Sequence, residues 1–434
     1  MNVENSPTIN MANSIVSEHN FHDLTINNDL KLIVDADLAN GEMDTISATS
    51  FGNSSGKITV TGINILSDID VNEIAEIEFA DDVLKNKVES VDKASSVLYN
   101  YRVRYDKETG NFKFINGLNG KTKNMGTAAS AVSATAGGAA TQSLVANQVF
   151  ASMDGKVSGI KKASTDSSNL YVSAGGQVFD NSGKTERGLW LKPFVTQETV
   201  KIGDADVDNN LYGTLAGIDF PMGQDKQVSF YLGYAGSKQE VEDVKSNQTG
   251  YILGATGMMI KENWYAGLTA NVMFNKASID TDFGTDDVDM NMFSIGSKAG
   301  YNYNVTDSFV LEPNLTLVYG VVNSDSYETS QGAEIDSQSV NNISVEPQVK
   351  AKLQMDNGWQ PYGLLGYSAN LGSKPTVKAE GVEIDLDSID GYVEYGAGVN
   401  KDFIGTVWSC YAQVTGRSGG RNGFAGNLGI KYKF

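Results

Sequence analysis

Two neighbouring stretches decide the fold: SFVLEPNLTLVYGV (Ser308–Val321) and ISVEPQVKAKLQM (Ile343–Met355). In both, apolar residues occupy every second position, while residues such as Glu312 and Lys350 stand between them. Side chains alternate between the two faces of a β-strand, so each stretch predicts a strand with one apolar and one polar face. Soluble strands usually have about five or six residues, whereas a tilted strand that crosses a bilayer needs about 9 to 11.

Similar segments recur down to the C-terminus, separated alternately by short turns such as 261–263 and long polar loops such as 324–341. This alternation is typical of outer-membrane barrels, and a β-sandwich has no reason to show it. Four tryptophans, Trp190, Trp264, Trp359 and Trp408, lie near segment starts, as expected for aromatic girdles at the membrane surfaces. We therefore predict an all-β protein with a twelve-stranded antiparallel outer-membrane β-barrel. The twelve segments begin near Arg187, Leu211, Lys226, Gln248, Trp264, Asp289, Ser308, Val340, Trp359, Gly391, Val407 and Gly423.

Composition excludes several other classes of protein. The net charge of -20 argues against nucleic-acid binding, which depends on Lys and Arg. Cys410 is the single cysteine and His19 and His22 are the only histidines, which argues against a disulfide framework, a metal centre or a Ser-His-Asp site. The acidic loop around Asp204–Asp208 lacks the glycine and distal glutamate of a calcium loop. We expect no cofactor, no metal and no enzymatic activity.

Residues 127–162 are rich in Ala and Ser, and the spacing of Leu144, Val149 and Met153 is helical. A helix from about Ala139 to Ile160 would be roughly 33 Å long, similar to the hydrocarbon thickness of a bilayer. We expect Gly137–Gly138 to kink or break it. Taken alone, the segment would be read first as a surface helix or spacer.

The N-terminal 90 residues are polar and contain short strand-like runs such as Leu30–Val34 and Ile58–Leu66. Short strands with regular turns suit either a sandwich or a β-solenoid. Residues 97–115 predict a β-hairpin with a Gly-containing loop of about five residues. The first ten residues lack a basic-then-apolar secretory signal, so we expect an exported protein to be present here in processed or shortened form.

Four stretches carry a resemblance to a known family: Leu189–Phe194, Tyr212–Asp219, Glu394–Val399 and the terminal Ile430–Phe434. With the preceding helix they make residues 127–434 similar to the C-terminal translocator of autotransporters, the type V secretion proteins of Gram-negative bacteria. The N-terminal part resembles, more weakly, the end of a β-solenoid passenger.

The resemblance implies four regions: a β-solenoid-like passenger remnant (1–96), a cap hairpin and connection (97–126), a linker helix through the pore (127–165) and the barrel (166–434). It implies an outer-membrane translocator that exports and displays its own passenger. Outer-membrane lipid and lipopolysaccharide, the barrel-assembly machinery and periplasmic chaperones would be its partners, and the barrel would be monomeric.

Three groups of residues would carry this function. The assembly machinery would recognise the alternating C-terminal residues. The pore helix would present small and apolar side chains, and inward charges would hold the helix or solvate the lumen. The assembly residues are Leu428, Ile430, Tyr432 and Phe434. The pore-helix residues are Leu144, Val145, Asn147, Val149, Phe150 and Met153. The inward charges are Asp219, Glu312, Glu346, Lys350, Lys352, Glu394 and Arg417.

In some family members a helix asparagine cyclises onto its own backbone and cuts off the passenger, assisted by inward acids. This chain has Asn124–Met125 and Asn147–Gln148 but no Asn-Asn pair, so we expect an uncleaved, tethered passenger. The alternative is a surface adhesin or structural outer-membrane protein with its binding site in residues 1–115 or in the long loops. A soluble secreted β-protein fits the alternating loop lengths less well, and an enzyme is the least supported class.

Overall fold

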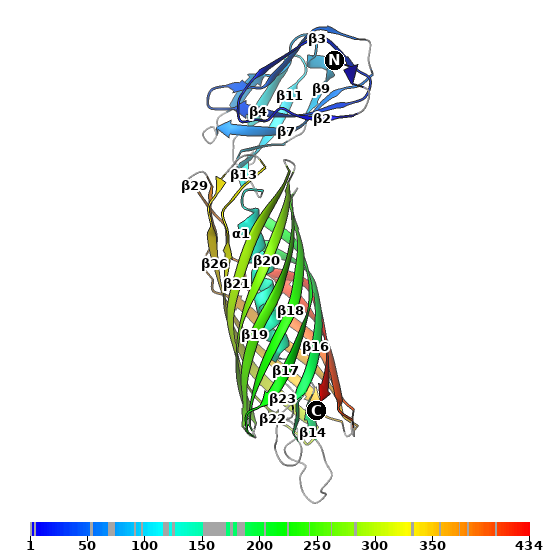
Figure 1. Cartoon of the computed structure of the whole chain (residues 1–434), viewed down its shortest axis with the longest axis vertical. Coiled ribbons are helices and arrows are strands. Elements are labelled where there is room, and N and C mark those ends of the chain that lie inside the picture. The colour runs from blue at the N-terminus through cyan, green and yellow to red at the C-terminus, as the bar shows by residue number, and fades with distance from the viewer. Residues whose placement is uncertain are drawn as a thin grey trace, which may run out of the picture.

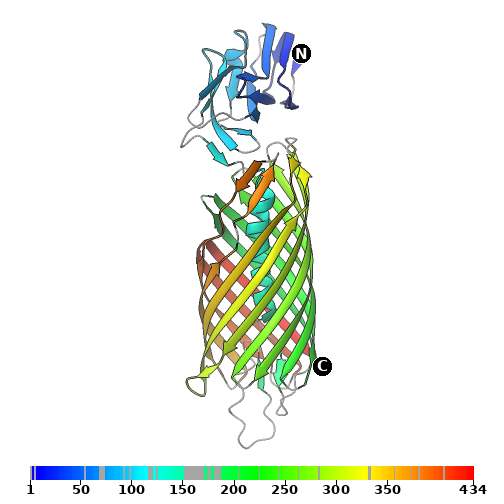
Figure 2. The same ribbon diagram turned by 90° about the vertical axis from the view of Figure 1, so that its left-hand side faces the viewer.

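The computed structural model shows an elongated molecule, in which a small N-terminal β domain stands at one end of a long β-barrel that encloses a helix (Figures 1 and 2). The C-terminus lies at the barrel end far from the N-terminal domain (Figure 1). The structure describes residues 2–3, 6–52, 55–67, 74–90, 93–96, 99–115, 121–123, 126–150, 171–173, 177–179, 187–203, 205–223, 225–242, 244–261, 263–281, 284–330, 334–355, 357–372, 374–379, 382–403 and 406–434.

The barrel is a ring of twelve antiparallel strands, as predicted. Each strand pairs with the next along the chain, and the last strand pairs with the first to close the ring. The longest strands have 18 residues, well beyond the usual strand of a soluble domain. The strands are β16 (Gly188–Ile202), β17 (Ala205–Pro221), β18 (Lys226–Val241), β19 (Val244–Lys261), β20 (Trp264–Thr281), β21 (Gly284–Tyr301), β23 (Phe309–Ser324), β26 (Gln338–Leu353), β27 (Trp359–Asn370), β30 (Tyr392–Asp402), β31 (Trp408–Gly419) and β32 (Arg421–Lys433).

The barrel wall has an apolar outer face and a mixed inner face. On β16, Leu189 and Leu191 are about half exposed on the outside, whereas Lys192 and Glu198 are buried on the inside. One expectation is wrong here: Trp190 does not belong to an outer aromatic girdle. It shares the even-numbered, inward face of β16 and is 5% exposed.

Short additional strands lie at both ends of the barrel. At the end near the N-terminal domain, two long loops form a four-stranded sheet of β24 (Tyr327–Glu328), β25 (Glu334–Ile335), β28 (Thr376–Ala379) and β29 (Val382–Asp385). Its Ile335, Val377 and Ile384 join a hydrophobic cluster with Ala131 and Val132 of the enclosed helix. This sheet therefore packs around the point where the helix enters the barrel. Elsewhere lie β22 (Tyr303–Asn304), which extends the β23 edge, and the hairpin of β14 (Tyr171–Ser173) and β15 (Gln177–Phe179).

The helix inside the barrel consists of α1 (Ala129–Ser133), a π-helical segment η2 (Ala134–Gly138) and α2 (Ala139–Phe150), and it runs without a break. We expected Gly137–Gly138 to kink or break the helix; a break is wrong, although both glycines lie in the π-helical segment, and the kink stays a prediction. The helix begins ten residues before Ala139. The glycines serve close packing instead: a Cβ on Gly137 would lie 2.0 Å from Nε2 of Gln239, and one on Gly138 2.7 Å from Cγ2 of Val322. Met153 and the rest of the expected helix up to Ile160 lie outside the described residues.

In the part of the chain that the structure describes, no helix combines the length and the apolar character needed to span a bilayer.

The N-terminal domain is built on parallel strand pairs. Leu30 pairs with Ile58, and Ile58 with Val88, so the chain returns to the same place after about 30 residues. Both sheets contribute to a single hydrophobic core. The β-solenoid interpretation of this region stays a prediction. The strands are β2 (Thr8–Asn10), β4 (Leu30–Asp37), β7 (Ile58–Ser67), β9 (Val88–Ser90) and β10 (Lys93–Ser96) in one sheet, β1 (Asn2–Val3), β3 (Glu18–Ile26) and β6 (Thr45–Phe51) in the other, and β5 (Glu42–Met43), which pairs with β4.

The predicted hairpin is present as β11 (Tyr99–Asp106) and β12 (Asn111–Ile115). Its turn has four residues, 107–110, and ends at Gly110, whose φ of 81° is in the left-handed region that glycine tolerates. The hairpin is extended by β8 (Ile74–Glu78), which pairs with β12, and β13 (Lys121–Lys123), which pairs with the start of β11. The 3-10 turn η1 (Lys85–Lys87) precedes β9.

The inward-facing Gly217 offers a test of the wall packing. A Cβ at this position would lie 2.2 Å from Cζ2 of Trp190, whereas one on the outward Gly257 would meet nothing within 4 Å. We expect Gly217→Ala to destabilise the barrel by about 1–3 kcal/mol through overpacking, and Gly257→Ala to change little. The temperature at which the unboiled gel band converts to the unfolded band measures this, and equal temperatures for both variants would contradict it.

Candidate functional site

The candidate site is the barrel lumen together with the helix that fills it. Apolar helix residues pack against the wall strands from β16 to β26. The helix approaches the wall closely at Gly296, which has no side chain. A Cβ added to Gly296 would lie 3.1 Å from the Cβ of Ala146. Small helix side chains and wall glycines therefore let a helix fit inside twelve strands. The helix residues of the main cluster are Ala134, Ala140, Leu144, Val145 and Val149, and Ala146 and Phe150 form a second cluster lower down.

Glu346 of β26 holds the middle of the helix. Its Oε1 accepts a hydrogen bond from Ser143 Oγ at 2.6 Å, and its Oε2 accepts one from Asn147 Nδ2 at 2.8 Å. Ser143 and Asn147 are four residues apart and so lie on one face of the helix. A single carboxylate thus fixes both the rotation and the height of α2.

Lys192 of β16 holds the lower end of the helix. Its Nζ donates a hydrogen bond to the backbone oxygen of Gln148 at 2.8 Å, and Tyr411 donates its hydroxyl to the side chain of the same residue. The ammonium group also lies 4.5 Å from the ring centre of Trp190. A cation near the last carbonyls of a helix is favourable because it satisfies these acceptors and complements the helix dipole.

The upper part of the helix makes neutral hydrogen bonds with the wall. Ser133 Oγ lies 2.7 Å from Ser246 Oγ, and Gln338 Nε2 donates to Ser130 Oγ at 3.1 Å. Gln142 donates to two wall carbonyls, at 3.3 and 3.4 Å. Polar contacts are therefore distributed along the whole helix.

A buried ionic cluster lies on the inner face where the barrel closes. Glu198 of β16 accepts hydrogen bonds from Nε and Nη2 of Arg421 on β32, and from Nη1 of Arg417 on β31 at 2.9 Å. Arg417 also donates to Glu394 of β30 at 3.1 Å. Each guanidinium group offers several donors, so one carboxylate and two arginines connect the first strand to the last two.

Two further ionic groups lie lower in the lumen. Asp219 of β17 pairs with Lys431 of β32 and accepts a hydrogen bond from the indole of Trp190 at 3.0 Å. Glu312 pairs with Lys352 and accepts the hydroxyl of Tyr265 at 2.6 Å. Because buried charges are costly unless they are paired, these groups are mutually dependent.

The structure brings the predicted lumen residues to the inner face of the wall. Six of them belong to the contacts just described, and Lys350 lies 5.4 Å from the ring centre of Tyr362. The predicted assembly residues Leu428, Ile430, Tyr432 and Phe434 point outward, and each is between 39% and 58% exposed. Of the predicted pore-helix residues, Leu144, Val145, Asn147, Val149 and Phe150 lie on α2.

Sequence reasoning missed several of the residues that hold the helix and close the barrel. Glu198 and Lys192 share the inward face with Trp190, and Lys431 alternates with the outward Ile430 and Tyr432. The period of two along each strand therefore contained the signal for all of them. Gln148 had no such signal, because its contacts depend on how the helix is placed in the barrel.

The chemistry of the lumen is that of binding a polypeptide. Among the described residues, no cluster of three or more His, Cys, Asp or Glu side chains could hold a metal ion. Of the two asparagines considered for self-cleavage, Asn124 lies outside the described residues, and the carboxamide of Asn147 is bound by Glu346.

The sequence matches the family described as "Autotransporter beta-domain" over residues 189–415, more than half of the 434-residue chain. The chain belongs to the autotransporter family. The autotransporter barrel is a transport domain and not a catalytic one, and it places this chain in the outer membrane of a Gram-negative bacterium. No match is found among curated proteins.

Solved structures support the same fold. The translocator domain of the autotransporter NalP from Neisseria meningitidis is 14% identical, with a TM-score of 0.55, and the match covers 70% of this chain and 100% of that one. The transport unit of the autotransporter AIDA-I from Escherichia coli is 19% identical, with a TM-score of 0.51, and the match covers 67% and 98%.

The cluster at the closing strands should contribute strongly to stability. Glu198→Ala leaves two buried guanidinium groups without their shared carboxylate, so we expect the free energy of unfolding to fall by about 3–5 kcal/mol. The matched control is Lys276→Ala, which removes an exposed ion pair with Asp287 and should change the free energy of unfolding far less, because solvent screens exposed charges. Urea unfolding in lipid vesicles measures both, and similar losses would contradict the expectation.

Glu346 should keep the pore closed. In Glu346→Ala, Ser143 and Asn147 lose charge-assisted hydrogen bonds together worth about 2 kcal/mol or more, so the helix should leave its position more often. We expect more frequent channel openings in planar bilayers than for the unsubstituted protein. Glu240→Ala, a change at an exposed carboxylate, is the control; openings unchanged in Glu346→Ala would show that this carboxylate does not hold the helix.

Proposed function

We propose that this autotransporter exports its own N-terminal region through the barrel and leaves it tethered at the cell surface. The observation that carries the proposal is the continuous helix Ala129–Phe150, which lies inside the lumen and begins at the barrel end nearest the N-terminal β domain (Figure 2). A simple adhesive porin has no need of such a helix. The presence of the helix therefore favours a translocator over the adhesin alternative.

Tethering is supported by the number and spread of the contacts that hold the helix. Ser133, Ser143, Asn147 and Gln148 are all bound by wall side chains, and the apolar face is buried along its length. The closed inner surface leaves the helix as the link between barrel and passenger. A passenger on such a link stays with the cell.

The exposed apolar residues of β32 support an assembly role for the C-terminus. Tyr432 and Phe434 stack with ring centres 6.1 Å apart, and Trp408 packs on Tyr432 at 4.9 Å. The three rings are exposed on the outside of the barrel, at the end of β32 and the start of β31, where another protein can reach them before the barrel closes. We propose that the assembly machinery binds this edge, after periplasmic chaperones have delivered an unfolded barrel that inserts as a monomer.

Intact mass of the protein extracted from outer membranes tests tethering. We expect a single species that contains both the N-terminal domain and the barrel, and the same species in Asn147→Ala. Protease added to intact cells should remove the N-terminal domain and leave the barrel. A barrel fragment that begins at residue 125 would refute a permanent tether. A fragment that begins at residue 148 and is absent in Asn147→Ala would also refute it.

Deletion of Phe434 tests the role of the terminal edge. We expect a several-fold lower amount of heat-modifiable protein in the outer membrane. Phe403→Ala is the matched control, because Phe403 is an exposed aromatic at the same end of the barrel but lies outside the last strand. Equal amounts of both variants would remove Phe434 from the assembly signal.

A further inference from the structure

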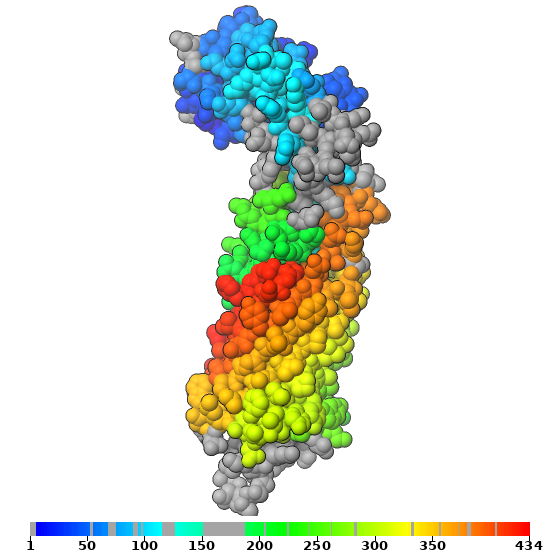
Figure 3. Space-filling model, turned by 180° about the vertical axis from the view of Figure 1, so that it is seen from behind, coloured from blue at the N-terminus to red at the C-terminus, as the bar shows by residue number. Residues whose placement is uncertain are grey.

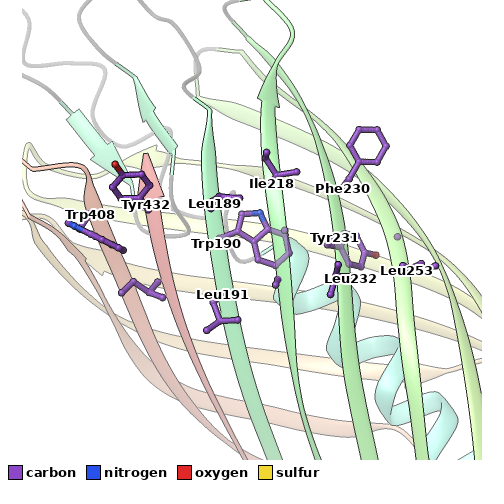
Figure 4. A pocket seen from close by; sticks show the side chains of 14 residues that line it. Leu189, Trp190, Leu191, Ile218, Phe230, Tyr231, Leu232, Leu253, Trp408 and Tyr432 are labelled. Carbon is purple, nitrogen blue, oxygen red and sulfur yellow. The ribbon is translucent and has the colours of Figure 1, made fainter. Parts of the chain in front are cut away.

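A large apolar groove lies on the outer face of the barrel beside the closing strands. Its volume is ≈ 1100 Å³, above the roughly 300–1,000 Å³ of typical small-molecule pockets. Figure 4 shows Trp408 and Tyr432 at one side, Leu189 and Leu191 near the middle, and Phe230 at the other side. The lining is almost entirely carbon, so an occupant must be apolar over most of its length.

The groove exists because small residues interrupt a surface of large ones. In the strand register, Ala216 stands between Leu191 and Leu232, and all three point outward. The lining also includes the backbone of Gly217. On the inner side of the wall, the ring of Trp190 fills the space that a side chain at Gly217 would need. The hollow therefore reaches down to the wall of the barrel.

A cation and several aromatic rings mark the end of the groove. The guanidinium carbon of Arg187 lies 5.8 Å from the ring centre of Phe220, and that ring lies 6.2 Å from the ring of Phe230 in the groove lining. The register of β16 with β17 ends at Gly188 opposite Asp219, so Arg187 and Phe220 lie just beyond it, at the ends of these strands. Aromatic residues at this level are typical of the boundary between hydrocarbon and head groups.

We propose that this groove is a binding site for one glycerophospholipid, with its acyl chains against Ala216 and its phosphate near Arg187. Flexible chains can fill an irregular hollow at a membrane-facing wall, and an arginine recognises phosphate oxygens well. The charge supports an anionic head group, since the cation stands at the rim end of an otherwise uncharged groove. The site depends on the barrel's place in the outer membrane and not on the secretion proposal.

Lipid binding to the purified full-length protein in detergent tests this site. The probes are dioleoyl phosphatidylglycerol and dioleoyl phosphatidylcholine, and native mass spectrometry counts bound lipid while thermal unfolding measures stabilisation. Ala216→Phe fills the groove and remains compatible with a lipid-facing wall. Ala299→Phe is the matched control, an exposed outward alanine on β21 far around the ring. The boiled and unboiled gel shift establishes that each variant forms a closed barrel.

We expect one phosphatidylglycerol per protein, with affinity at least about tenfold lower in Ala216→Phe and unchanged in Ala299→Phe. Arg187→Gln should lower affinity for phosphatidylglycerol about fivefold, and affinity for phosphatidylcholine by less, because its phosphate is balanced by its own cationic group. Equal binding by both phenylalanine variants would overturn the proposal. So would a protein dimer that Ala216→Phe dissociates without any change in bound lipid, since the groove would then hold a second copy of the chain.

Discussion

Pairing between β16 and β32 is the interaction on which the rest of the structure depends. In hydrocarbon every backbone polar group must be paired, and only ring closure removes the two strand edges. The ladder runs from Gly188 opposite Lys433 to Val200 opposite Arg421. It skips Lys192 and Pro193, where proline has no amide hydrogen to offer. The buried ion pairs of Glu198 and Asp219 with β32 reinforce this junction from the inside.

Closure creates an interior that has to be filled. An open lumen of twelve strands would leave a permanent channel, and a fully apolar interior would resist the passage of a polypeptide. The structure combines paired charges on some strands with uncharged, small or amide side chains along most of β18, β19 and β20. A helix of small residues packs on that uncharged wall, and its polar face meets Glu346 and Lys192. The same inner surface can therefore bind the helix firmly and bind other polypeptide segments weakly.

The sequence was most informative where a local period determines the outcome. The alternation of residues 309–321 correctly assigned Glu312 to the inner face and Leu315 to the outer face. The same rule applied to β16 would have placed Trp190 inside and revealed Glu198. In the helix, local propensity gave the wrong expectation. Gly137–Gly138 would weaken an isolated helix, but here only glycine leaves room for the side chains of Gln239 and Val322.

Contacts between distant segments were beyond sequence reasoning. Asn147 and Glu346 are separated by 199 residues, and no local pattern links them. Tyr411 and Lys192 meet the same glutamine only because the barrel closes and the helix lies at one particular height within it. The family resemblance supplied the idea of a pore helix, but only the three-dimensional arrangement identifies the residues that hold it.

The spread of these contacts has a mechanical consequence. A pull on the N-terminal domain acts along the axis of a helix about 33 Å long, for 22 residues. The hydrogen bonds to Ser133, Asn147 and Gln148 are distributed along the same rigid helix. If the helix slides along its axis, all of them are stretched at the same time. A linker of this kind resists extraction along its own axis, because several hydrogen bonds must break together before the helix can slide.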